Sequence, residues 1–250
     1  MSAPFLLAVC RRPGAIADDE ISFLDQHTGL APGRGLDVIN LLDDGCPEPG
    51  ALELGTWAGV LITGSPLSLT GPLSPDPAHE RLRERVLALS LRLVQEDVPT
   101  LGLCFGLQSI VLALGGSLRD DVGEELQAPV MTLTEAGAAD PLTAALAPSF
   151  RAYVGHSQSV TGLPGGGVVL ATGTRCPIQM GRWGRNVYGT QFHPEITTAG
   201  MRVRIDAYGD AYYPAHERAA VIERCDAADV RPANRVVSSF VQRYRGRTRS

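Results

Sequence analysis

Cys104 lies at the centre of the segment Gly-Leu-Cys-Phe-Gly at residues 102–106, between a short apolar run and a segment with helical periodicity. This spacing of two glycines around a nucleophile is typical of a sharp turn from a strand into a helix, with cysteine where serine often stands. Small residues on both sides let the backbone pass close to itself. The following helix points its N-terminus at the sulfur, which favours the thiolate. The pattern therefore predicts a nucleophilic cysteine.

A base for that nucleophile is supplied by the segment Gln-Phe-His-Pro-Glu at 191–195. Pro194 blocks helix formation and favours an extended backbone at His193. In an extended backbone residues i and i+2 project to the same side, so Glu195 can bond one imidazole nitrogen while the other faces Cys104. The carboxylate would fix the tautomer and stabilise the imidazolium. The order Cys, His, Glu disfavours the α/β-hydrolase fold, in which the acid precedes the histidine.

Two further groups complete the predicted site. Gly64 and Ser65 follow an apolar run, so they are expected at the same sheet edge as Cys104. One of their backbone N–H groups, together with that of Phe105, would stabilise a developing oxyanion. Gln108 lies four residues after the cysteine, about one helical turn, and its amide can face the pocket and bind a polar substrate end.

The elements that must position these residues follow from the apolar pattern. Up to residue 125, short apolar runs typical of buried parallel strands alternate with amphipathic segments. They predict strands at 5–10, 36–42, 59–63 and 99–103 and helices at 76–95 and 105–114. Further along, Gly and Pro separate shorter strand candidates at 129–134, 168–171, 178–181 and 186–191, which indicates a meander or mixed sheet. The tail from about Thr198 is predicted to be helical, most clearly at 215–228 and 234–244.

The whole-chain composition limits the possible partners and location. A net charge of −5 over 250 residues argues against nucleic acid as the main partner. The five cysteines show no metal-ligand spacing, and their odd number fits a reducing cytosol. No run approaches the roughly 20 apolar residues of a membrane helix. We expect a cytoplasmic protein with one domain over 1–250, comprising a core at about 5–198 and a helical extension at about 199–246.

The paired motifs resemble those of the class I (triad) glutamine amidotransferases, above all the glutaminase domain of GMP synthase and its stand-alone relatives. The resemblance rests on Gly-Leu-Cys-Phe-Gly-Leu-Gln at 102–108 and Gly-Thr-Gln-Phe-His-Pro-Glu at 189–195. Three weaker matches support the resemblance. Thr-Gly-Ser-Pro at 63–66 resembles the family's oxyanion loop, and Gly-His-Ser-Gln-Ser-Val at 155–160 resembles the loop around the amino-acid end of glutamine. Cys-Pro-Ile-Gln at 176–179 resembles a segment upstream of the histidine strand. The resemblance covers the chain from Phe5 to about Thr198.

The resemblance implies an α/β fold, a flavodoxin-like three-layer sandwich whose mostly parallel central sheet carries extra antiparallel strands. It implies that Cys104 attacks the glutamine carboxamide, forms a γ-glutamyl thioester and releases ammonia, with His193 as general base and acid oriented by Glu195. Ser157 and Gln158, together with Gln108, would hold the glutamyl end. No metal or organic cofactor is implied. Because no synthetase domain follows the glutaminase-like part, ammonia would pass to a separate acceptor subunit.

Two departures from the family pattern leave other functions open. Ser65 and Ser157 stand where the family often has glycine. A γ-glutamyl peptidase or hydrolase acting on γ-glutamyl conjugates is therefore one alternative. A non-catalytic regulatory module is another, although the complete Cys-His-Glu set argues against it. Tyr208, Tyr212 and Tyr213 could line the rim of the site or form the apolar face of the tail helices.

Overall fold

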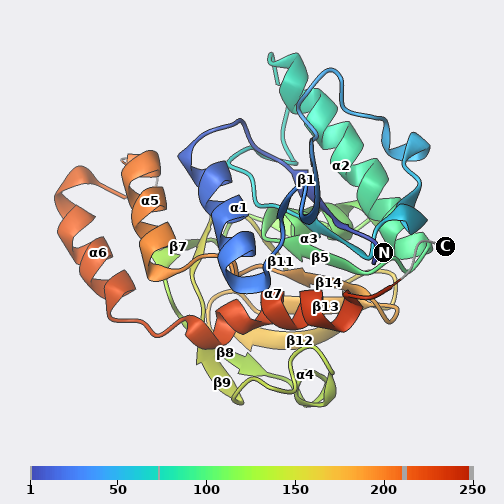
Figure 1. Ribbon diagram of the computed structural model, residues 1–250. Coiled ribbons are helices and arrows are strands. Elements are labelled where there is room, and N and C mark those ends of the chain that lie inside the picture. Colours follow the sequence, from blue (N-terminus) through green and yellow to red (C-terminus); the bar gives the residue numbers. More distant parts are fainter. Residues whose placement is uncertain (1, 73, 210–212, 248–250) are drawn as a thin grey trace.

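A ten-stranded sheet forms the centre of the protein in the computed structural model, which describes residues 2–72, 74–209 and 213–247 (Figure 1). One half of the sheet is parallel and contains, in spatial order, β2 (Ala31–Pro32), β3 (Gly35–Asn40), β1 (Phe5–Val9), β4 (Gly59–Ile62), β5 (Thr100–Leu103) and β14 (Val187–Thr190). The other half continues from β14 with antiparallel pairing through β13 (Met180–Trp183), β12 (Val168–Gly173), β8 (Val130–Leu133) and β9 (Ser149–Arg151).

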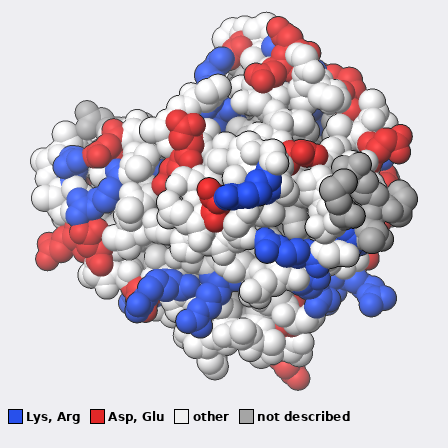
Figure 2. Space-filling model, viewed as in Figure 1, with Lys and Arg blue, Asp and Glu red and all other residues white. Residues whose placement is uncertain are grey.

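Helices cover both faces of this sheet, which gives three layers. One face is covered by α2 (Pro77–Gln95) and α3 (Phe105–Ala113), and the other by α1 (Ala15–Thr28) and α7 (Arg231–Tyr244). Figure 1 shows α7 running across the front of the sheet, and arginine side chains gather along the same part of the surface in Figure 2. The short helix α4 (Glu135–Ala139) packs against β12.

A smaller layer lies beside the parallel half and borders the candidate site. It contains α5 (Thr198–Tyr208), α6 (Arg218–Asp226) after the 3₁₀ turn η4 (Ala215–Glu217), and the antiparallel pair β7 (Glu124–Gln127) and β10 (Val154–His156). A second pair joins β6 (Leu118–Arg119) to β11 (Ser159–Val160). Two 3₁₀ turns, η1 (Pro49–Ala51) and η2 (Leu54–Thr56), lead into β4.

The parallel strands are apolar throughout because both of their faces are buried. In β1, Phe5 and Leu7 pack under α1 and α7, while Leu6 and Ala8 pack under α2. Helix α2 starts where the sequence indicates, since the side chain of Asp76 accepts a hydrogen bond from the backbone N–H of Ala78 at 3.0 Å. The predicted fold class, with its mostly parallel sheet, antiparallel strands and C-terminal helices, is confirmed.

The element boundaries differ from the predictions in places. Helix α1 was not predicted, because its buried face includes Glu20, whose charge interrupts the apolar periodicity. The strand expected at 178–181 is β13 at Met180–Trp183. The helix expected at 215–228 is divided into η4 and α6, and α7 begins three residues before the predicted 234 because Pro232 is accommodated in its first turn. Among the described residues, no helix combines the length and apolar character required to cross a membrane.

Candidate active site

Cys104 occupies a strained turn between β5 and α3. Its φ of 49° and ψ of −91° place it among the few non-glycine residues with positive φ. The flanking glycines are required by close packing: a Cβ at Gly102 would lie 2.7 Å from the carbonyl carbon of Gly106, and one at Gly106 would lie 3.0 Å from Ile62 O. The thiol is therefore held at the carboxyl edge of the sheet, and the turn has the geometry of a nucleophile elbow.

His193 and Glu195 lie just after the neighbouring strand β14. The backbone N–H of His193 donates to Tyr153 O at 2.8 Å. Asn234, from α7, donates through its side-chain amide to Pro194 O at 2.8 Å and to Ile196 O at 2.9 Å. The loop is thus fixed from both sides, and the 2.7 Å contact between His193 Nδ1 and Glu195 Oε1 forms as the spacing predicts. Asn234 had no motif to identify it, since its partners are backbone carbonyls.

Glu195 and Cys104 both act on the pKa of the His193 imidazole. Burial alone would lower the pKa of His193, but the charges of Glu195 and Cys104, with hydrogen bonds to both, raise it to about 10. Burial would raise the pKa of Glu195, yet the charge and hydrogen bond of His193 hold it below its usual range. Gln191 Nε2 also donates to Cys104 Sγ at 3.4 Å. The arrangement can sustain a buried thiolate–imidazolium pair.

The predicted substrate-binding residues surround one side of the thiol. Ser65, Gln108, Ser157 and Gln158 line a cavity of about 70 Å³ with Cys104. Gln108 Nε2 donates to Gln158 O at 2.7 Å, so it contacts the loop backbone. The side chain of Gln158 is turned away to Asp120 and Thr70, which leaves its backbone nearest the cavity.

The predicted oxyanion donors lie at the same edge. Phe105 is the first residue of α3, where a backbone N–H has no acceptor within the helix. Gly64 approaches the base closely, because a Cβ there would lie 3.0 Å from His193 Cε1. Ser65 lines the cavity of about 70 Å³ and also a smaller cavity on the other side of Cys104. The other eight predicted site residues therefore gather around Cys104, and their individual roles stay predictions.

A buried charge network beside His193 and Glu195 was not predicted. Arg11 Nη2 lies 3.0 Å from Glu20 Oε1, and Arg204 contacts Glu20 at 3.5 Å and Asp19 at 2.7 Å. Both arginines are almost fully buried, and the charge of Arg204 contributes to the lowered pKa of Glu195. Arg11 lies two residues after the end of β1, at the sheet edge that carries Cys104. That position in the sequence was the available signal.

A second, smaller cavity lies on the histidine side of the thiol. It measures about 20 Å³ and is lined by Cys104, His193 and Arg204, together with Met201 and Tyr208 of α5. Arg11 Nη1 donates to the Tyr208 hydroxyl at 3.0 Å. Of the other two tyrosines considered from the sequence, Tyr213 is buried among α5 and α6 residues and Tyr212 lies outside the described residues.

Comparison with known proteins identifies the family. Residues 67–205 match the family model of the class-I glutamine amidotransferases, a stretch that includes both motifs. This chain belongs to that family. A glutamine-hydrolysing GMP synthase subunit from Halobacterium salinarum is 38% identical over 165 residues, covering 65% of this chain and 79% of that relative. The glutamine-hydrolysing GMP synthase of Salmonella arizonae is 32% identical over 154 residues, or 58% of this amidotransferase chain and only 27% of the Salmonella protein.

Solved structures show the same fold at low sequence identity. A glutamine amidotransferase from Thermotoga maritima superimposes with a TM-score of 0.74 at 18% identity, covering 97% of this chain and 98% of that one. A glutamine amidotransferase from Methylobacillus flagellatus gives a TM-score of 0.68 at 20% identity, covering 100% and 97%. The amidotransferase fold thus accounts for the chain from β1 to α7, and the resemblance inferred from the two motifs is confirmed.

Proposed function

We propose that this amidotransferase hydrolyses the side-chain amide of glutamine through a thioester on Cys104 and passes the ammonia to a separate acceptor protein. The observation that carries the proposal is the buried His193–Glu195 pair set against a thiol in a strained elbow. A fold without this reaction has no need of a positive φ at cysteine or of a carboxylate bonded to the imidazole.

The steps follow from the positions of these groups. The Cys104 thiolate attacks the amide carbon, and the N–H groups of Phe105 and of Gly64 or Ser65 stabilise the resulting oxyanion. The His193 imidazolium gives its proton to the amide nitrogen as the carbon–nitrogen bond breaks, so ammonia leaves and a γ-glutamyl thioester remains. A water molecule then loses a proton to His193 and attacks the thioester. Glutamate is released, and the thiolate–imidazolium pair is restored.

The two cavities divide the substrate between them. The cavity of about 70 Å³ faces Gln108 and the 157–158 loop, so it suits the glutamyl end. The amine must leave on the side of its proton donor His193, where the cavity measures about 20 Å³. A cavity needs roughly 10–15 Å³ to hold one water molecule, so ammonia or water fits there and a larger amine does not. This supports free glutamine over γ-glutamyl conjugates, which would require α5 to move.

The acceptor is proposed from the relatives. The Halobacterium relative is named as one subunit of a glutamine-hydrolysing GMP synthase, so we propose that ammonia from this chain goes to a synthetase on another chain. A cytoplasmic location fits the proposal, because all five cysteines are free thiols and such thiols persist in a reducing compartment.

Substrate choice tests the proposal. We expect wild-type protein to release ammonia from glutamine with a kcat/KM at least tenfold above that for γ-glutamyl-p-nitroanilide. Met201→Ala, which widens the leaving-group cavity, should narrow this ratio, and Cys104→Ala should lose both activities. A preference for the anilide in wild type would support the conjugate hydrolase instead. Failure of well-folded protein to react at Cys104 with a glutamine-mimicking electrophile would support the regulatory module.

A further inference from the structure

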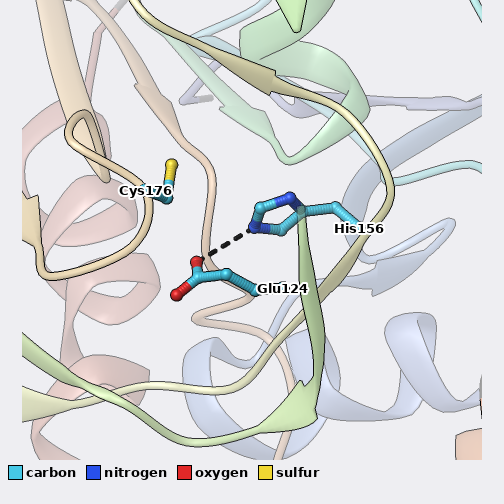
Figure 3. Close-up of side chains that lie close together, drawn as sticks. All are labelled: Glu124, His156 and Cys176. Atoms are coloured by element: carbon cyan, nitrogen blue, oxygen red, sulfur yellow. Dashed lines mark hydrogen bonds and ion pairs between the residues drawn. The ribbon is translucent and has the colours of Figure 1, made fainter. Parts of the chain in front are cut away.

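A cluster of metal-binding side chains lies behind the loop that lines the glutamyl-side cavity. Glu124 begins β7, His156 ends β10 and Cys176 lies in the loop after β12, and their exposed fractions are 5%, 6% and 0%. One donor atom from each lies within 4.8 Å of the other two. Figure 3 shows the imidazole and carboxylate in contact, with the thiol beside them. None of the three takes part in the reaction proposed above.

Polar groups hold the ring of His156 on both sides. Ser159 Oγ lies 2.9 Å from His156 Nδ1 and donates to Val122 O at 3.1 Å. His156 Nε2 lies 3.1 Å from Glu124 Oε2, which also accepts from Gln179 Nε2 at 2.7 Å. Because Ser159 holds Nδ1, Nε2 faces the carboxylate, and in this orientation both atoms can bind one cation.

Cys176 completes a set of side chains suited to a metal ion. Cysteine, histidine and carboxylate side chains are the ligands that zinc takes. The Cys176 thiol, which donates to Ile178 O at 3.3 Å, lies beside the other two. Atoms within 4.8 Å of one another lie within about 2.8 Å of a common centre (4.8 divided by √3), and zinc bonds measure about 2.0–2.3 Å. Shifts of less than about 1 Å would close the site. The buried Gln179 Oε1 adds an acceptor without a hydrogen-bond partner.

We propose that Glu124, His156 and Cys176 bind a zinc ion, with water as the fourth ligand. On binding, the thiol releases its proton to solvent. The imidazole coordinates the zinc ion through the lone pair of Nε2, while Nδ1–H donates to Ser159 Oγ. A hollow of about 480 Å³, lined by Glu124, His156 and Arg175 among others, connects the cluster with the surface. The ligands come from three segments far apart in the sequence, so no spacing motif indicates them.

Zinc would be coupled to the active site through His156. That residue also lines the glutamyl-side cavity, next to Ser157 and Gln158. A metal ion that fixes the end of β10 therefore also fixes the start of this loop. If zinc changes the affinity for a ligand in the glutamine site by some factor, that ligand must change the affinity for zinc by the same factor. The coupling rests on the proposed function, whereas the zinc site does not.

Metal content of the untagged Cys104→Ser protein tests the site. This background is used because Cys104 also has a histidine beside it and could bind zinc itself. After equilibration with micromolar zinc and gel filtration, we expect one zinc ion per chain by plasma mass spectrometry. The cobalt-loaded protein should show thiolate-to-metal absorption in the near ultraviolet. Adding Cys176→Ser should abolish both signals. Adding Cys225→Ser, a change at an equally buried thiol in the α6 layer, should preserve both.

Two further results bear on the same claim. Gln179→Leu removes the amide that holds Glu124 and should weaken zinc binding by about 10–100-fold. If Cys176→Ser fails to fold by circular dichroism, Glu124→Gln provides the same loss. Zinc below stoichiometry in the Cys104→Ser protein would overturn the proposal and leave a hydrogen-bonded His–Glu pair without a metal. Equal zinc content with and without Cys176 would overturn it as adventitious binding. Neither result touches the proposed glutamine hydrolysis, because no step of the assay requires turnover.

Discussion

Replacing Glu195 with glutamine would remove the charge beside His193 while keeping the size of the side chain. The 2.7 Å contact at Nδ1 can persist as a hydrogen bond to the amide oxygen, so the change isolates the charge. Burial opposes the imidazolium, but Glu195 and Cys104 together raise the pKa of His193 from 6.5 to about 10. The pKa difference of 3.5 (10 minus 6.5), at about 1.4 kcal/mol per pKa unit, means that the imidazolium is favoured by about 5 kcal/mol.

We expect kcat for glutamine to fall by about 10²–10⁴-fold in Glu195→Gln, or about 3–5 kcal/mol of transition-state stabilisation. The alkaline limb of the pH profile should also move. In the wild type the imidazolium persists as pH rises to about 10, and activity that depends on it is lost through that pH. The same raised pKa stabilises the fold fully below pH 6.5, and that contribution disappears as the pH approaches about 10. In Glu195→Gln, the activity and this contribution to stability should both be lost at a lower pH than in the wild type.

The assay is the initial rate of ammonia release from glutamine between about pH 6 and 11, the range that brackets the His193 pKa. Glu223→Gln, an equivalent change at an exposed position of α6, is the matched control and should leave the rate and the profile unchanged. Circular dichroism at each pH separates lost activity from lost structure. A Glu195→Gln enzyme with kcat within about threefold of wild type and the same alkaline limb would refute the role given to the carboxylate.

Three structural predictions can be checked by urea denaturation. Gly102→Ala places a Cβ 2.7 Å from a backbone carbonyl carbon and should lower the free energy of unfolding by about 1–3 kcal/mol. The control Gly162→Ala meets nothing within 4 Å and should lower it much less. Equal losses of stability in the two variants would contradict the close packing of the elbow. Glu20→Gln leaves Arg11 buried without its anion and should cost about 3–5 kcal/mol; a neutral effect would mean that water compensates the charge. Asn234→Ala strands two buried carbonyls, which predicts a loss of about 1–3 kcal/mol and a lower kcat; unchanged kcat would show that the His-Pro-Glu loop holds its shape alone.

Features encoded by neighbouring residues were predictable from the sequence. The elbow at Cys104 follows from two glycines that only a tight strand-to-helix crossing requires, and the contact of His193 with Glu195 follows from their spacing around Pro194. The buried strands were equally clear, because a strand covered on both faces must be apolar throughout. The paired motifs also identified the family, and the fold followed from it.

Features made by distant residues were not predictable in the same way. Glu20 meets Arg11, from the segment after β1, and Arg204, from α5, only after folding. The charge of Glu20 also interrupts the apolar face of α1. Asn234 fixes the loop at 193–196 from helix α7. The sequence suggested this helix only as part of a C-terminal extension, although α7 packs directly on the central sheet. Interactions of this kind depend on the crossing of elements and leave no local periodicity.

Trapping the acyl intermediate tests the account most directly. Rapid acid quench of the enzyme during glutamine turnover, followed by proteolysis and mass spectrometry, should reveal one glutamyl group on the peptide that contains Cys104. The adduct should be sensitive to hydroxylamine, as a thioester is, and should be missing from Cys104→Ser. Steady ammonia release from glutamine by the Cys104→Ser protein, or a glutamyl group attached elsewhere in the wild type, would contradict the claim that this sulfur carries the reaction.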